Sequence, residues 1–236
     1  MIIHHFRRIE KPVLLCYDSS EVNFHMRLMI DDCFDTMPWE QIDTVVLDVG
    51  NVLLSWQAQE LLDLLVPDRP DLHAELTIRI FKSPYWCMRD RGSATLEEVI
   101  AAMSKTAPEL EPYVRRVMQN WIDLPAMPEG VSALKACKAH GKRLYALTNY
   151  ADKEFAHACA THDFFALFDD YVVSGREHMV KPQQGIYDCL ISRFGLDPSR
   201  TLFIDDSPAN IEAALECGWQ GLCYNKPGKL ALFFGA

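Results

Sequence analysis

The stretch Thr44–Leu54 constrains the fold more than any other part of the chain. It begins with four apolar or β-branched residues, Thr44–Leu47, the composition of a short strand that is buried on both faces. Asp48 follows directly, and Gly50 stands two residues later. Ligands of open parallel sheets bind beyond the carboxyl ends of the strands, where Asp48 would lie. An ordinary strand followed by a polar residue has the same pattern, so the remaining chain decides between the two interpretations.

From Pro128 onward, helix and strand patterns alternate along the chain. Strands are predicted at Arg143–Leu147, Asp170–Ser174, Thr201–Ile204 and Gly221–Tyr224. Helices are predicted at Glu129–His140, Lys153–Thr161, Ile186–Phe194 and Ala209–Cys217. This alternation indicates an α/β fold, a doubly wound parallel sheet with right-handed crossovers and helices on both faces.

The region between the first strand and Pro125 contains only helical patterns, separated by proline and glycine. Helices are predicted there at Trp56–Val66, Asp71–Phe81, Leu96–Ser104 and Leu110–Ile122. We therefore expect residues 41–54 and 126–236 to form a Rossmann-like α/β core, and residues 55–125 to form a helical cap inserted after the first strand. Residues 1–40 lack sustained periodicity and are expected to be a poorly ordered N-terminal extension.

Composition narrows the class of partner. The 236 residues carry 33 acidic and 23 basic side chains, a formal net charge of -10, which disfavours nucleic acid or an anionic membrane as a partner. The eight cysteines include no C-x-x-C pair, and no secretory signal or membrane-spanning run is visible. We expect a reduced, cytoplasmic protein, a monomer or homodimer, that binds a small molecule.

Polar side chains stand at the ends of the predicted strands. They are Asp48, the pair Thr148-Asn149, the pair Asp205-Asp206 and, in a loop before a helix, Lys181. A parallel sheet would bring all of them to one edge. Carboxylate oxygens suit Mg²⁺, and an ammonium with a hydroxyl suits a phosphate group. Each has an ordinary explanation alone, as a helix cap, a surface turn or a solvated strand end, but together they predict a magnesium and phosphate site.

In this order, the segments resemble the four motifs of the haloacid-dehalogenase-like hydrolase superfamily, over about Asp43 to Tyr224. The matching segments are Val45–Leu53, Leu147–Asn149, Val180–Pro182 with Gly185–Tyr187, and Leu202–Ile211. The segment Arg89–Gly92, followed by Thr95–Glu98, is similar to the cap of the subgroup that contains sugar-phosphate phosphatases and the phosphatase domain of epoxide hydrolases.

The resemblance implies roles for these residues. Asp48 would be the nucleophile that forms an aspartyl-phosphate, which water then hydrolyses. The Asp48 carboxylate, the Gly50 carbonyl and Asp206 would hold Mg²⁺, with Asp205 either a further ligand or a support for the others. Thr148 and the Asn149 backbone would hold the phosphoryl oxygens, and Lys181 would neutralise charge between nucleophile and phosphate. The implied function is a Mg²⁺-dependent phosphatase that acts on a small phosphorylated metabolite.

Gly50 departs from the common pattern of these phosphatases. Most carry an aspartate at this position, two residues after the nucleophile, as general acid and base. Some phosphatases with the D-x-G-N version are active, so the glycine leaves catalysis possible and puts the proton-transfer step in question.

Two other functions remain open from the sequence. A haloacid dehalogenase also uses an aspartate nucleophile but no metal, and the doubled carboxylate Asp205-Asp206 disfavours it because it would repel an anionic substrate. A non-catalytic binding protein of the same fold is disfavoured because four residues of the expected site are present together: Asp48, Thr148, Lys181 and Asp206.

The cap is expected to select the substrate. Arg89 and Arg91 suit a second anionic or hydroxylated group, and Trp86 suits the face of a sugar. The alternative, equally weighted, is that both arginines are solvated and Trp86 lies in the cap's own core. Trp56 and Trp121 are expected to pack between cap and core.

Overall fold

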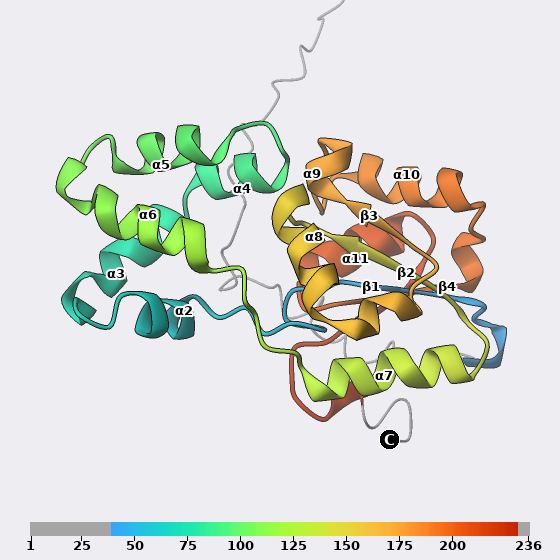
Figure 1. The fold of residues 1–236 in the computed structure, drawn as a ribbon. Helices are drawn as coiled ribbons and strands as arrows, with labels where there is room; N and C mark the ends of the chain where they lie inside the picture. Colours follow the sequence, from blue (N-terminus) through green and yellow to red (C-terminus); the bar gives the residue numbers. More distant parts are fainter. Residues whose placement is uncertain (1–38, 231–236) are drawn as a thin grey trace, which may run out of the picture.

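Five parallel strands form a central sheet in the order β3-β2-β1-β4-β5 (Figure 1). The strands are β1 Thr44–Leu47, β2 Arg143–Thr148, β3 Asp170–Val173, β4 Thr201–Asp205 and β5 Gln220–Cys223. The computed structural model describes residues 39–230, so the predicted N-terminal extension lies outside the described residues except for Trp39 and Glu40. The α/β fold with a parallel sheet is confirmed.

The pairing register aligns the carboxyl ends of the three central strands. Leu47 at the end of β1 pairs with Ala146 on β2 and with Ile204 on β4. The residues that follow these three positions therefore reach the same edge of the sheet. β1 lies between two other strands, and all four of its residues are fully buried.

Helices cover both faces of the sheet. Alternate residues of a strand point to opposite faces, and in β1 the residues on both faces are apolar. Val45 and Leu47 belong to a hydrophobic cluster that includes residues of α7 and α8, whereas Val46 belongs to one built with α10 and α11. The helices of this part are α7 Pro128–Ala139, α8 Asp152–Thr161, α9 Ser174–Glu177, α10 Gln184–Phe194 and α11 Pro208–Glu216. Residues 39–230 contain no helix that is long and apolar enough to cross a membrane.

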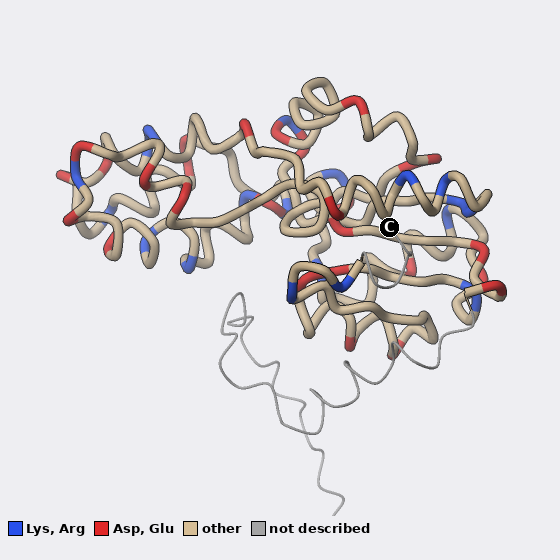
Figure 2. The backbone as a smooth tube through the Cα atoms, turned by 90° about the horizontal axis from the view of Figure 1, so that it is seen from below, with Lys and Arg blue, Asp and Glu red and all other residues tan. Residues whose placement is uncertain are grey.

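A group of helices, here called the helical insertion, lies between β1 and β2 in the sequence and stands beside the sheet (Figures 1 and 2). Its helices are α2 Ala58–Leu65, α3 His73–Leu76, α4 Pro84–Asp90, α5 Leu96–Ser104 and α6 Glu111–Asn120. Leu54 forms an antiparallel bridge with Ala126, and the Ser55 N–H donates to the Pro125 carbonyl at 2.8 Å. The chain thus enters and leaves the insertion through one hydrogen-bonded neck.

The helical insertion differs from the prediction in detail. The break predicted at Pro84 is present, because Lys82 and Ser83 separate the helical turn ending at Phe81 from the next helix. The helix that begins there, α4, was not predicted; Pro84 is its first residue, where a proline loses no helical hydrogen bond and its fixed φ suits the helix. The helix predicted at Asp71–Phe81 is divided into a 3₁₀ turn, α3 and a π-helical turn. Ser174, predicted to end β3, begins α9 instead, and its buried hydroxyl donates to the Asp90 carbonyl at 2.7 Å.

A row of aromatic rings joins the insertion to the sheet domain. Trp86 packs against Trp56 and Trp121 with ring centroids 5.6 and 5.1 Å apart, and Trp121 packs against Tyr150 after β2 at 5.6 Å. The expected packing between cap and core is observed for Trp121, whereas the ring of Trp56 packs against Phe81 and Trp86 of the insertion itself. Trp86 is only 6% exposed, in agreement with the alternative that it belongs to a packed core.

The loop after β1 is held by a close approach of α7, which gives a first prediction. A Cβ added at Gly130 would lie 1.7 Å from the Val52 carbonyl oxygen, so backbone must move. We expect Gly130→Ala to lower the free energy of unfolding by about 1–3 kcal/mol. Chemical denaturation measures this, with Ser132→Ala at an exposed position of the same helix as the control. Equal stability of the two variants would contradict the packing.

Candidate active site

Asp48 follows β1 directly and is only 7% exposed. Its backbone N–H continues the sheet by donating to the Ile204 carbonyl at 2.8 Å. The next residues turn sharply, because the Leu53 and Leu54 N–H groups both donate to the Val49 carbonyl at 2.9 Å. This turn fixes the carboxylate at the edge of the sheet, with its Oδ1 accepting from the Val49 N–H at 2.7 Å.

Lys181 is the cation at the centre of the site. Its Nζ lies 2.8 Å from Asp48 Oδ1 and 2.7 Å from Asp205 Oδ2, and the residue is 3% exposed. The Asn149 side chain holds the lysine backbone on both sides, since its Oδ1 accepts from the Lys181 N–H at 2.8 Å and its Nδ2 donates to the Lys181 carbonyl at 3.0 Å. Asn149 thus positions Lys181 from the end of β2.

Asp205 is fully buried and surrounded by donors. Its Oδ1 accepts from the Ser207 N–H at 2.8 Å and from Asn210 Nδ2 at 3.0 Å, while Lys181 occupies Oδ2. Asn210 was given no role from the sequence. Its place five residues after Asp205, on the first turns of α11, is the signal that could have indicated one.

Asp206 lies beside this pair and is partly exposed. Its Oδ2 accepts from Asn51 Nδ2 at 3.0 Å. One carboxylate oxygen from each of Asp48, Asp205 and Asp206 lies within 4.8 Å of the others, an arrangement that could hold a metal ion. The predicted convergence of the three carboxylates and Lys181 at one edge of the sheet is therefore observed.

The carboxylates oppose one another's ionisation. Burial raises the pKa of Asp48 to about 7, and the charges of Asp205 and Asp206 add to this against the lowering effect of Lys181. Burial and the Asp205 charge likewise raise the pKa of Asp206 to about 6. Burial alone would lower the pKa of Lys181, but the two carboxylates that it contacts raise it.

The charge balance of the cluster suits a divalent cation. Three carboxylates face a single ammonium, so full ionisation leaves two negative charges uncompensated. Carboxylate oxygens at this spacing are the ligands that Mg²⁺ takes in proteins. The Lys181 and Val49 contacts of Asp48 both use Oδ1, and the Asn51 contact of Asp206 uses Oδ2. Asp48 Oδ2 and Asp206 Oδ1 are therefore the oxygens best placed to bind a cation.

Thr148 ends β2 and is 1% exposed, next to Asn149 at the same edge of the sheet. The two predicted arginines lie elsewhere. Arg89 on α4 forms a partly buried ion pair with Glu154 on α8, with Nη2 to Oε1 at 2.5 Å. The Arg91 carbonyl lies 3.1 Å from His178 Nδ1. Among the described residues, neither arginine contacts the carboxylate cluster.

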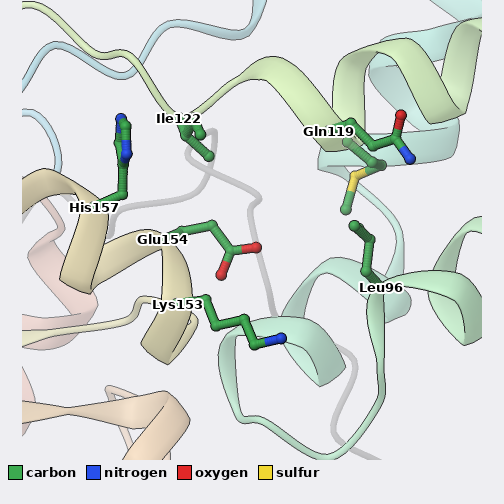
Figure 3. A pocket seen from close by; sticks show the side chains of 7 residues that line it. Leu96, Gln119, Ile122, Lys153, Glu154 and His157 are labelled. Carbon is green, nitrogen blue, oxygen red and sulfur yellow. The ribbon is translucent and has the colours of Figure 1, made fainter.

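A cavity of about 170 Å³ opens between the insertion and α8 (Figure 3). Glu154, the partner of Arg89, points into it beside Lys153. The residues that line it are Leu96, Met118, Gln119, Ile122, Lys153, Glu154 and His157. The carboxylate cluster contributes no side chain to this cavity, so the cavity is separate from the candidate site.

Known proteins with similar sequences and folds include hydrolases. The sesquiterpene phosphatase astK of Aspergillus oryzae is 25% identical over 184 residues, which cover 75% of this chain and 87% of that protein. The solved structure of the HAD family enzyme bt-2542 from Bacteroides thetaiotaomicron, in complex with magnesium and inorganic phosphate, matches with a TM-score of 0.60 at 19% identity, covering 79% of this chain and 96% of that one.

The L-2-haloacid dehalogenase of Xanthobacter autotrophicus has the same fold, with a TM-score of 0.59 at 17% identity and coverage of 76% of each chain. Similarity of fold at these identities therefore does not distinguish a phosphatase from a dehalogenase. The family model for haloacid dehalogenase-like hydrolases matches residues 42–218, which include every residue of the carboxylate cluster. The chain belongs to the family of haloacid dehalogenase-like hydrolases.

Proposed function

We propose that this hydrolase is a Mg²⁺-dependent phosphatase that acts on a small phosphorylated metabolite through an aspartyl-phosphate. The observation that carries the proposal is the buried ammonium of Lys181, held between Asp48 and Asp205 within a cluster of three carboxylates. The cluster combines an oxygen nucleophile, a fixed cation and oxygen ligands for a metal, the components that phosphoryl transfer needs. The phosphatase astK, similar over most of both chains, supports the same reaction class.

In the first step, the Asp48 carboxylate attacks phosphorus, an oxygen–phosphorus bond forms, and the ester bond to the leaving group breaks. The leaving oxygen takes a proton from water. In the second step, a water molecule attacks phosphorus and gives a proton to solvent, the bond between Asp48 and phosphorus breaks, and the Asp48 carboxylate and inorganic phosphate are released. Lys181 contacts Oδ1 of Asp48, so it orients the nucleophile and offsets charge on the transferring group. Thr148 and the Asn149 backbone hold phosphoryl oxygens, and the Asn149 side chain keeps Lys181 in place.

We assign the metal ligands to the carboxylates of Asp48 and Asp206 and to the Gly50 carbonyl. Asp205 acts as a support, because hydrogen bonds from Lys181, Ser207 and Asn210 already occupy both of its oxygens. When bound, Mg²⁺ neutralises the carboxylates and the phosphate. The alternative, a metal-free haloacid dehalogenase, is disfavoured because the uncompensated carboxylates of the cluster would repel an anionic substrate.

The helical insertion serves as the cap over this site in the proposed mechanism. Arg91 is its candidate for substrate binding: the Nε atoms of Arg89 and Arg91 are both buried without a hydrogen-bond partner among the described residues, but only Arg89 forms an ion pair there. Arg89, proposed from the sequence for the same role, is joined to Glu154 and so acts on the substrate by positioning the cap.

The nucleophile is tested by Asp48→Asn. We expect turnover to fall by about 10⁴-fold or more, because the amide keeps the shape of the side chain but does not attack phosphorus. Phosphate release from a panel of phosphorylated metabolites measures this. Asp43→Asn is the matched control, since Asp43 precedes the same strand at its opposite end and pairs only with exposed arginines, Arg143 and Arg200, among its ion pairs. Comparable turnover in the two variants would exclude Asp48 as the nucleophile.

The raised carboxyl pKa values predict pH-dependent metal binding. Mg²⁺ binds ionised carboxylates, so protons compete as the pH falls through about 7 and then about 6, the pKa values of Asp48 and Asp206. From about pH 8 to about pH 5.5, the affinity should fall on the order of 100-fold. Calorimetric titration at each pH measures this, and a change smaller than twofold would show that these carboxylates are not the ligands.

Gly50 offers a test of proton transfer. A Cβ at this position would meet nothing within 4 Å, and Gly50 is not among the glycines with positive φ, so a side chain fits. A general acid contributes about 10²–10⁴-fold, most for poor leaving groups. We expect Gly50→Asp to raise the rate with alkyl phosphates relative to a nitrophenyl phosphate by about 10-fold or more. Gly50→Ala, which adds Cβ without the carboxyl, is the control. The same leaving-group dependence in both variants would show that a carboxyl at position 50 does not act as a general acid.

A further inference from the structure

The Asn51 side chain lies between the carboxylate cluster and the chain that enters the helical insertion. On one side, its Nδ2 donates to Asp206 Oδ2 at 3.0 Å. On the other, its Oδ1 accepts from the Trp56 backbone N–H at 3.0 Å and from Gln57 Nε2 at 3.1 Å. Two donors on one end and a carboxylate on the other fix the orientation of the amide.

Beyond Asn51, the chain of contacts continues into the insertion. Trp56 packs its ring against Phe81 and Trp86, with centroids 5.5 and 5.6 Å apart. Gln57 is the residue immediately before α2. The backbone N–H of Trp56 bonds to Asn51 Oδ1, and its ring packs within the insertion. A shift of the insertion would therefore move the group to which Asn51 Oδ1 is bonded.

The backbone of Asn51 alone does not account for these bonds. Its φ of 53° lies in the left-handed region, which asparagine tolerates and glycine adopts freely. Glycine would therefore satisfy the turn without a side chain. The three side-chain hydrogen bonds are an additional feature, and they link residues of the nucleophile loop, the β4 loop and the entry to the insertion.

We propose that Asn51 is a positioning residue that couples the cation site at Asp206 to the helical insertion. This inference rests on the proposed Mg²⁺ site. The Nδ2 donor bonds to Asp206 Oδ2, which leaves Oδ1 for the cation, and a hydrogen bond to an ionised carboxylate is stronger than one to a neutral group. Coupling between two sites is reciprocal, so contacts that hold the insertion in place strengthen cation binding, and cation binding in turn holds the insertion.

The test uses variants on both sides of the amide. Asn51→Gly keeps the turn and removes all three bonds, and we expect its Mg²⁺ affinity to fall by about 10-fold or more, the range for residues that orient a metal ligand. Gln57→Ala removes one exposed donor that touches no carboxylate of the cluster, and we expect a loss of about two- to fivefold. In the Asn51→Gly background, Gln57→Ala should have no further effect, since it acts through Asn51.

Calorimetric titration with MgCl₂ gives the affinities. Tryptophan fluorescence during the same titration reports chiefly on the insertion, since three of the five tryptophans, Trp56, Trp86 and Trp121, pack there. Its Mg²⁺-dependent change should be present in the unmodified protein and lost in Asn51→Gly. Gln59→Ala is the matched control, because this exposed glutamine near the start of α2 bonds to Asp63 and His73 within the insertion. It should bind Mg²⁺ as the unmodified protein does.

The outcomes separate the two proposals. If the folded, unmodified protein binds no Mg²⁺, the proposed function fails and this inference fails with it. If the unmodified protein binds Mg²⁺ and Gln57→Ala binds it as tightly as Gln59→Ala does, the coupling is overturned while the metal site stands. Circular dichroism shows whether Asn51→Gly is folded. If it is not, the Mg²⁺ affinities of Gln57→Ala and Gln59→Ala alone decide whether the coupling exists.

Discussion

The buried contact of Lys181 with Asp48 and Asp205 is the interaction on which the rest of the site depends. An ammonium taken out of water costs several kcal/mol unless opposite charges and hydrogen bonds surround it. Two carboxylates compensate the charge of Lys181, and Asn149 holds its backbone from the end of β2. The same carboxylates then need donors of their own, which explains why Asp205 has the Ser207 N–H and the Asn210 amide around it. The uncompensated negative charge is shared by Asp48 and Asp206, the two carboxylates that we propose as cation ligands.

The pairing register of the sheet brings the polar groups of the site to the same edge. Since β1 pairs with β2 and with β4, the residues that follow Leu47, Ala146 and Ile204 arrive together, although they lie far apart in the sequence. This part of the site could be predicted, because a polar residue directly after a buried strand has a defined position relative to the sheet. The alternation of helices and strands predicted a parallel sheet, but it did not predict the strand order β3-β2-β1-β4-β5.

Other parts of the site depend on contacts that no local pattern specifies. Asn149 was expected to act through its backbone, yet its side chain makes two hydrogen bonds to Lys181, 32 residues away. Arg89 was expected at the substrate, but Glu154, 65 residues further along, holds it in an ion pair. Residue type and spacing indicate that such groups are available for polar contacts. The partner is determined only when the insertion packs on α8, so it lies beyond sequence patterns.

The packing between the insertion and the sheet also limits how the two can move. At Gly92, φ is +68° and an added Cβ would lie 2.5 Å from the Gly175 carbonyl, so the end of α4 approaches the start of α9 as closely as backbone atoms allow. The Arg89–Glu154 pair lies in the same seam, with both side chains largely buried. Separating the seam would expose aromatic surface at Trp121 and Tyr150, and would solvate an ion pair that gains little net energy when buried. The aromatic packing is therefore the contact in this seam that we expect to stabilise it more, and the ion pair contributes little net free energy.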